Sequence, residues 1–188
     1  MRDFRPARVT NGNGNTASQA RWGSPLRVVG AVVAITGGFM LTPASVAAIY
    51  GETAVMEALL LAAAITATIG GALWWHLRDH RNLSTVQAFG AVGLSWFAMS
   101  AFGSLPYLLT GSIPSVTDAF FESASGFTAT GSSVVADPAT LTHGVLFWRA
   151  LTHWLGGMGV IVLAVSLLPL LGVGAVMLAK AESPGPDP

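Results

Sequence analysis

The sequence predicts an all-α integral membrane protein with four transmembrane helices and one shorter, re-entrant helix. Apolar residues make up 52% of the 188 positions and charged residues only 10%, whereas charged residues make up about 25% of an ordinary soluble domain. Four apolar runs are each long enough to cross a bilayer, which takes about 20 residues. A fifth apolar stretch, Val116–Gly126, is too short to cross.

The first part of the chain predicts a tail followed by a pair of helices. Residues 1–24 are polar, contain the stretch NGNGN and lack apolar periodicity, so we expect a disordered cytoplasmic tail. Residues 25–82 hold the first two apolar runs, 26–48 and 55–77. An alternative for the first run is a cleavable signal peptide, because arginines precede it and small residues follow its apolar centre. The later topology is the same in both cases.

The second part, residues 83–176, predicts a helix, a short helix with a turn, and another helix. The third apolar run covers residues 83–109, and the last long run covers residues 143–172. Pro169 is expected to kink the end of that last helix. Residues 177–188 are polar again and are expected to begin a linker to a further segment.

The distribution of charge predicts the orientation. Spanning helices alternate sides, so the arginines before the first run, those after the second, and Lys180 after the last fall on one face. The positive-inside rule makes that face cytoplasmic, which places the N-terminus inside the cell. The spaced tryptophans, among them the pair Trp74 and Trp75, are expected to be anchors at the membrane interfaces.

The stretch Val116–Gly126 is expected to form a half-length helix. At 1.5 Å per residue it would extend roughly 16 Å, about half of a bilayer. Ser115 with Asp118 three residues later is typical of a helix start, and Gly126 suits a helix end. A half-helix followed by polar backbone is tolerated at membrane depth only when it is packed in protein or lines a watery cavity. A re-entrant helix is therefore predicted, and the alternative is an external loop with an interfacial helix.

The polar turn after this helix, formed by Thr128, Ala129, Thr130 and Gly131, predicts an ion site. The C-terminal end of a helix carries about half a negative charge, which favours a cation. An extended strand beyond it could direct backbone carbonyls inward, and rings of carbonyls replace the hydration shell of an alkali ion. Glycine is suited to a positive φ that keeps its carbonyl in line. The T-x-T-G pattern is weak alone, and its position between two spanning helices makes it informative.

The residues around this turn resemble a known family. The run LPYLLTGSIPSVTDAFFESASGFTATGSSVV is similar to the first pore loop of the TrkH/KtrB family of potassium-uptake proteins. The run FWRALTHWLGGMGVIVLAVSLLPLLGVG is similar to the helix that follows it in the TrkH branch, and KAESPGP is similar to the linker to the next repeat. The resemblance covers residues 105–186, and the opening pair fits the branch's extra N-terminal helices by position only.

The resemblance implies four consecutive helix–pore loop–helix repeats around one pore, as in the potassium-channel-like superfamily. Thr128, Ala129, Thr130 and Gly131 would be one filter strand for K⁺, the transported ion, and no cofactor is expected. The resemblance also implies a homodimer, a TrkA-like nucleotide-binding subunit on the cytoplasmic side, and a bacterial inner membrane. Because this chain holds one repeat, we expect it to be a fragment whose filter needs the remaining repeats.

Five other residues are given supporting roles. Glu122 and Arg149 are expected to form an ion pair that braces the half-helix, because charges at membrane depth are usually paired. The alternative is that both side chains reach interfacial water. Gly156, Gly157 and Gly159 are expected to serve helix packing, because small residues let helices approach in lipid, and a hinge is the alternative.

The sequence shows no pattern typical of an enzyme or of a nucleic-acid-binding protein. Cysteine is absent, and the four histidines are scattered without the spacing of a zinc-binding helix. There is no phosphate loop, no paired catalytic carboxylates and no basic patch. We therefore expect a potassium-uptake subunit in contact with membrane lipid, and the alternative is a non-conducting scaffold or regulatory fragment of the same fold.

Overall fold

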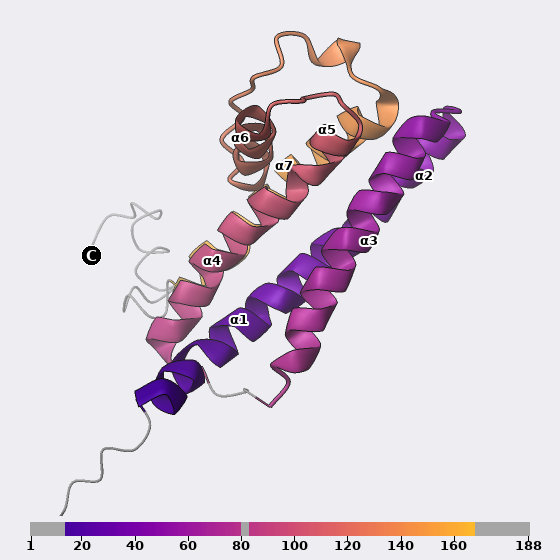
Figure 1. The fold of residues 1–188 in the computed structure, drawn as a ribbon. Coiled ribbons are helices and arrows are strands. Elements are labelled where there is room, and N and C mark those ends of the chain that lie inside the picture. Colours follow the sequence, from indigo (N-terminus) through magenta and orange to yellow (C-terminus); the bar gives the residue numbers. More distant parts are fainter. Residues whose placement is uncertain (1–13, 80–82, 168–188) are drawn as a thin grey trace, which may run out of the picture.

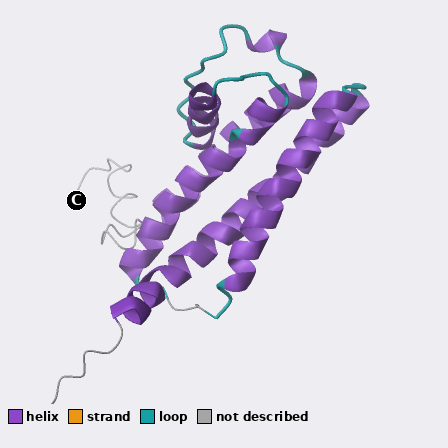
Figure 2. Cartoon of the chain, viewed as in Figure 1, coloured by secondary structure: helices purple, strands orange, loops and turns teal. Residues whose placement is uncertain are grey.

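The described part of the protein is a set of helices joined by short turns and one longer loop (Figure 2). The structure is a computed structural model that describes residues 14–79 and 83–167, and neither range contains a strand. Within these ranges, four segments are long and apolar enough to cross a membrane: 22–49, 53–76, 85–109 and 143–163. The prediction of four spanning segments is confirmed, and the protein is a multi-pass membrane protein.

The N-terminal span consists of two helices. α1 (Gly14–Phe39) and α2 (Leu41–Ile49) follow each other with a single turn residue, Met40, between them. The sequence predicts a disordered tail through residue 24, but α1 begins at Gly14 and residues 14–24 are helical. The stretch contains Ala, Gln and Arg, which have high helix propensity and need no apolar face to form a helix that continues a spanning one.

The second span, α3 (Thr53–His76), returns alongside α1 with its backbone close to that of α1 (Figure 1). A Cβ atom added to Gly30 would lie 2.7 Å from the backbone nitrogen of Trp74. Additions at Gly37 and Gly70 would meet backbone atoms of the facing helix at similarly short distances. Small residues permit such an approach between membrane helices.

The third span is also made of two helices, α4 (Thr85–Gly103) and α5 (Leu105–Leu109). Ser84 begins α4 with a capping box: its hydroxyl accepts the N–H of Gln87 at 3.3 Å, and its own N–H donates to Gln87 Oε1 at 3.0 Å. Pro106 lacks the N–H that would continue the hydrogen-bond ladder of α4, and the helical pattern is interrupted at Ser104, between α4 and α5.

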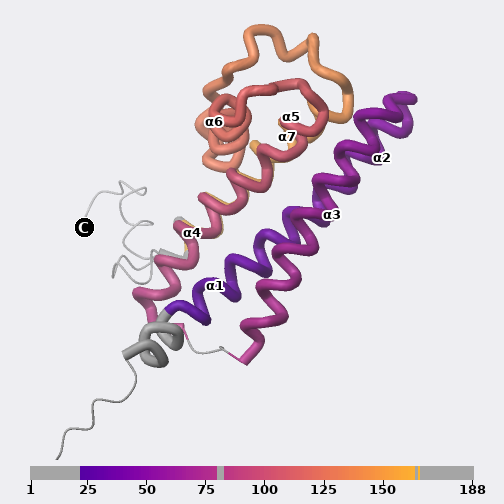
Figure 3. Tube along the Cα trace, in the orientation of Figure 1, coloured from indigo at the N-terminus to yellow at the C-terminus, as the bar shows by residue number. Residues whose placement is uncertain are grey.

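The short α6 (Val116–Phe127) packs against both α4 and the last span, α7 (His143–Leu167). Figure 3 shows the α6 coil beside the end of α4 that leads into α5. Ser115 caps α6 by accepting the N–H of Asp118 at 3.4 Å, as the sequence predicts. A long loop connects α6 to α7 and contains one 3₁₀ turn, η1 (Pro138–Thr140).

The main hydrophobic core lies where the N-terminal pair meets α5, α6 and α7. Its largest buried side chains come from four different segments: Met40, Tyr107, Phe127 and Trp148. Phe127 and Trp148 meet edge to face, with ring centroids 6.2 Å apart, an arrangement that aromatic rings favour. The core therefore holds the C-terminal end of α6 against α7.

The expectation that the tryptophans are interface anchors is wrong for two of them. Trp148 is fully buried, and its indole N–H donates to the carbonyl of Gly103 at 3.0 Å. Trp96 is partly buried, and its indole N–H donates to the carbonyl of Phe127 at 3.0 Å. A buried indole needs an acceptor for its N–H, and here the two acceptors are backbone carbonyls at helix ends.

Some expectations fall on residues outside the described ranges. These are the tail before residue 14, the end of the last apolar run with Pro169, and the polar segment 177–188 with Lys180. The helix α1 runs through residue 24, and the division of the chain at residues 82 and 176 remains a prediction.

Candidate functional site

The end of α6 forms a tight left-handed turn. The N–H of Thr130 donates to the carbonyl of Ser125 at 3.0 Å, and the N–H of Ala129 donates to that of Gly126 at 2.9 Å, which is the pattern of a Schellman motif. Ala129 occupies the left-handed position with φ 54°, where glycine is the usual residue. Gly126 therefore does not end the helix, and the segment expected to be extended begins with a turn at Thr128 and Ala129.

The carbonyl oxygens of residues 128–131 accept no hydrogen bond from the described part of the chain. The carbonyls just before them are occupied, because Ala124, Ser125, Gly126 and Phe127 each accept one. A backbone carbonyl is a strong acceptor that is normally paired, so the loop presents oxygen atoms that are free to contact a cation. Gly131 lies in this loop with φ 80°.

The two threonine hydroxyls stabilise the loop from the helix side. Thr128 Oγ1 donates to the carbonyl of Ala124 at 2.7 Å and lies 2.8 Å from Thr130 Oγ1. Both threonines line a hollow of about 200 Å³, together with Ser125 and Phe121 of α6. The hydroxyls therefore help to fix the loop against α6.

Glu122 of α6 is fully buried and connects three parts of the site. Its Oε1 accepts the Arg149 Nε–H of α7 at 2.6 Å. Its Oε2 accepts the backbone N–H of Val134 at 2.9 Å, and the hydroxyl of Ser133 lies 3.0 Å and 3.1 Å from the two carboxylate oxygens. A buried carboxylate is stable when it is paired and hydrogen-bonded in this way, and it fixes the chain just after Gly131.

Glycines permit the close approach of α6 to its neighbours. A Cβ atom at Gly156 of α7 would meet the backbone carbonyl of Phe127, and one at Gly103 of α4 would lie 2.6 Å from Ser123 Oγ. The other two glycines of the predicted packing group differ from Gly156. A Cβ at Gly157 would meet nothing within 4 Å, and one at Gly159 would reach only Trp96, at 3.7 Å.

A second carboxylate, Glu52, joins the N-terminal pair to the start of α7. It lies between α2 and α3, and its two oxygens accept the backbone N–H groups of His143 at 2.8 Å and Gly144 at 3.0 Å. The ring of His143 lies 2.9 Å from Glu52 Oε1 and stacks on Tyr50 with ring centroids 3.8 Å apart. The free N–H groups of a helix N-terminus favour a carboxylate.

The hydrogen bonds to Glu52 also lower the pKa of its carboxyl. Burial of the group acts in the opposite direction and is the largest single influence, but the N–H groups of Gly144 and His143 and the His143 ring together outweigh it. The carboxylate is therefore the favoured form of Glu52 in the folded protein.

The described residues contain no group of three or more His, Cys, Asp or Glu side chains that could hold a metal ion. An alkali ion in a protein pore is coordinated by neutral carbonyl oxygens instead. The unpaired backbone carbonyls of Thr128, Ala129, Thr130 and Gly131 are neutral oxygens of this kind.

Sequence reasoning missed several residues of the site. Trp96, Gly103 and Ser133 contact α6 or its loop from other segments, and the cap by Glu52 joins residues that are 91 positions apart. Only Ser133 carried a signal, because it follows the T-x-T-G turn by two positions. The other contacts depend on which helix faces pack against each other, and this is known only from the folded structure.

Comparison with known proteins finds a family model described as "Cation transport protein", TrkH, which matches residues 55–187. The match includes α3, so it extends further toward the N-terminus than the resemblance seen in the sequence. The most similar curated relatives include the "Trk system potassium uptake protein TrkH" of Escherichia coli (strain K12) and that of Salmonella typhimurium. Each is 41% identical over 162 residues, which is 85% of this chain and 33% of the relative.

A third relative, the "Trk system potassium uptake protein TrkI" of Halomonas elongata, is 34% identical over 173 residues, covering 89% of this chain and 34% of that protein. The chain spans about a third of the length of the curated relatives it matches.

Proposed function

Because the chain belongs to the TrkH family of cation transport proteins, we propose that it is part of a potassium-uptake transporter and supplies one strand of a K⁺ filter. The observation that carries the proposal is the row of unpaired carbonyls at residues 128–131, directly after a short helix held between two spans. The names of the relatives, which are potassium uptake proteins of Trk systems, support the choice of ion.

In this proposal α6 is a re-entrant pore helix and Thr128, Ala129, Thr130 and Gly131 are the filter strand. The C-terminal end of α6 carries partial negative charge toward the ion. The carbonyls replace water ligands of K⁺ as it passes, and Gly131, with its positive φ, turns the strand without a Cβ near the ion path. One strand supplies only part of a coordination shell, so conduction requires the remaining repeats.

The ion pair of Glu122 and Arg149 acts as a brace in this mechanism. It ties α6 to α7 and, through Ser133 and Val134, holds the chain that leaves the filter. Electrostatic sites work best when their dipoles are fixed before the ion arrives. Gly156 serves the same end by letting α7 approach the last carbonyls of α6.

We further propose the membrane, the orientation and the partner subunits of the assembled transporter. The assembled transporter lies in a bacterial inner membrane with the N-terminus in the cytoplasm, works as a homodimer, and is gated by a TrkA-like nucleotide-binding subunit. The Trk-system names of the relatives and the arginines at the α1 end of the protein support this arrangement.

A chimera tests the proposal. The matching third of the Escherichia coli (strain K12) relative is replaced by this chain, and K⁺ uptake is measured in bacteria that lack other uptake systems. We expect K⁺-limited growth and uptake to be restored. Failure to restore uptake by a chimera that reaches the membrane would favour the scaffold alternative.

The filter assignment is tested in the same chimera by Gly131→Ala with Gly111→Ala as the matched control. Both glycines have positive φ, 80° and 71°, and both have open space where a Cβ would lie, so the backbone strain of the two substitutions is similar. We expect only Gly131→Ala to reduce uptake and the preference for K⁺ over Na⁺. Equal effects of the two substitutions would remove Gly131 from the filter.

A further inference from the structure

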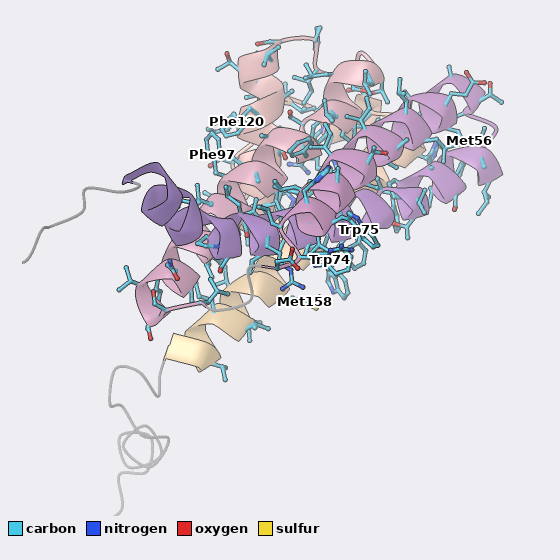
Figure 4. The ribbon with its side chains drawn as sticks, turned by 60° about the horizontal axis from the view of Figure 1, so that its bottom comes forward. Met56, Trp74, Trp75, Phe97, Phe120 and Met158 are labelled. Carbon is cyan, nitrogen blue, oxygen red and sulfur yellow. The ribbon has the colours of Figure 1, made fainter. Side chains whose placement is uncertain are left out.

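The end of the protein formed by the start of α1 and the end of α3 carries two arginines without a carboxylate partner among the described residues. The guanidinium carbon of Arg27 lies 5.9 Å from the ring centroid of Trp74, and that of Arg78 lies 5.2 Å from Trp75. Figure 4 shows the two indoles close together. The Nε of Arg27 is buried and has no hydrogen-bond partner among the described residues, while the side chain as a whole is half-buried. A buried charged donor is stabilised when an acceptor binds it, so this position favours an anionic ligand.

Arg27 lines a cavity of about 180 Å³ that lies between α1, the end of α3 and the residues before α4. Ser24, one turn earlier on α1, and the ring of Trp74 also line it. A guanidinium next to a hydroxyl can bind phosphate oxygens with charge-assisted hydrogen bonds. Tryptophan is typical of the level of lipid headgroups.

The rest of the cavity wall is apolar, and a larger apolar groove adjoins it. Val28 and Val32 line both spaces. The groove measures about 390 Å³ and lies between α1, α4 and α7, with Val92, Met99 and Leu163 among its walls. A cationic cavity that continues into an apolar groove matches a molecule with an anionic head and a hydrocarbon chain.

We propose that these two spaces form a binding site for one anionic phospholipid. Its phosphate contacts Arg27 and Ser24, and one acyl chain lies along Val28 and Val32 in the groove between α1, α4 and α7. Basic pockets between helices at a membrane surface are suited to such headgroups. The lipid would fill the space between α1 of the N-terminal pair and the helices α4 and α7. The site does not depend on the ion path at Gly131.

Native mass spectrometry of the protein purified in mild detergent tests the site. Phosphatidylglycerol and phosphatidylcholine with identical acyl chains are added in separate titrations, and inorganic phosphate in a third. We expect one phosphatidylglycerol to bind at least about tenfold more tightly than phosphatidylcholine. Both lipids carry the phosphate, but the choline of phosphatidylcholine adds a quaternary ammonium that the Arg27 guanidinium repels. Inorganic phosphate should neither bind at the same concentration nor displace the lipid, because it lacks the acyl chain.

Arg27→Gln should abolish the preference for phosphatidylglycerol, and Arg78→Gln should keep it. Arg78 is the matched control, because it also lies over an indole at this end but lines neither space. Helical circular dichroism of both variants checks that they fold. A phosphatidylglycerol with a photoreactive acyl chain should label the groove, at Val92 or Met99.

Four results would overturn the proposal. Equal binding of the two lipids would remove the headgroup site. Displacement of the lipid by inorganic phosphate would make the cavity a site for free anions. Labelling outside the groove, or loss of lipid preference in Arg78→Gln but not in Arg27→Gln, would place the lipid elsewhere on the protein.

Discussion

The N-terminal pair and the α6 site are both closely packed, but the contacts that hold them differ in kind. In the first region, Gly30, Gly37 and Gly70 form a glycine seam in which α1 and α3 touch backbone to backbone. In the second region, α6 is held by side-chain hydrogen bonds from Glu122 and Trp96 and by one ion pair, in addition to glycine contacts. The seam fixes a distance between two helices, whereas the polar contacts fix the position of individual backbone atoms.

Under the proposed function, this difference suits the two regions to different tasks. Packing between apolar helices in lipid depends on shape and tolerates small shifts of one helix along the other. A loop that presents carbonyls to an ion needs its atoms held within a fraction of an ångström. Buried polar contacts supply that constraint, and they are costly to break because each leaves an unsatisfied partner.

The largest effect in this comparison is expected from Glu122→Gln. The substitution leaves Arg149 without its charge partner, and breaking a buried pair typically costs about 3–5 kcal/mol. The measurement is thermal unfolding in detergent, together with amide exchange at Val134. We expect Val134 to lose protection in Glu122→Gln, while amides of α3 stay protected.

A double variant separates the pair from its surroundings. Glu122→Gln together with Arg149→Gln removes both charges. The stability lost in the double variant should therefore be clearly smaller than the sum of the stabilities lost in the two single variants. Additive losses would mean that the two charges act separately and that the brace is not an ion pair in solution.

The next effect is expected in the glycine seam, from Gly70→Ala. Its added Cβ would meet the backbone nitrogen of Ala34, which cannot move without shifting α1, and overpacking of this kind costs about 1–3 kcal/mol. Gly71→Ala is the matched control, because a Cβ there meets nothing within 4 Å. The unfolding temperature should fall only for Gly70→Ala. In that variant the amide exchange rates of α1 and α3 should rise, while the amide of Val134 stays protected. Equal effects of both substitutions would contradict the seam.

The sequence predicts much of this molecule, because apolar run length and helix caps are local signals. The four spans and the start of α6 at Val116 agree with the structure to within a few residues, apart from the start of α1 and the end of the last span, which lies outside the described residues. The pairing of Glu122 with Arg149 could be proposed because isolated charges are rare in apolar spans. The sequence does not say which glycine of each pair is packed: Gly70 and Gly156 are, whereas their next neighbours face open space.

The cap by Glu52 could not be predicted from sequence for a related reason. It bonds the start of α7 from a turn 91 positions away, and no local pattern links the two segments. Its position is set by how the N-terminal pair packs on α7. The same limit applies to Ala129, since alanine gives no sequence signal of a left-handed conformation.

A smaller and pH-dependent effect is expected from Glu52. Its pKa in the folded protein lies below the ordinary value of 4.5, so its contribution to stability is complete above that value and is lost as the pH falls through the folded-state pKa. Glu52→Gln should lower stability by about 1 kcal/mol at neutral pH and flatten the acid limb of the stability curve. The measurement is thermal unfolding between pH 7 and pH 3, with Glu57→Gln, an exposed carboxylate on α3, as the control. An unchanged acid limb in Glu52→Gln would assign the acid sensitivity to other carboxylates.

The smallest effect, and the only one expected to stabilise, is that of Ala129→Gly. Ala129 has φ 54° at the end of α6, and a non-glycine residue in this region costs about 1 kcal/mol. Glycine removes that cost, and its greater freedom in the unfolded chain partly offsets the gain. The free energy of unfolding should therefore rise by less than about 1 kcal/mol. Ala124→Gly is the matched control, because it makes the same change inside α6, where glycine is unfavourable by about 1 kcal/mol. If the two substitutions change the free energy of unfolding with opposite signs, the turn at Thr128 and Ala129 is held in a strained form by its neighbours. A loss of stability in both variants would mean that Ala129 is not left-handed in the folded protein.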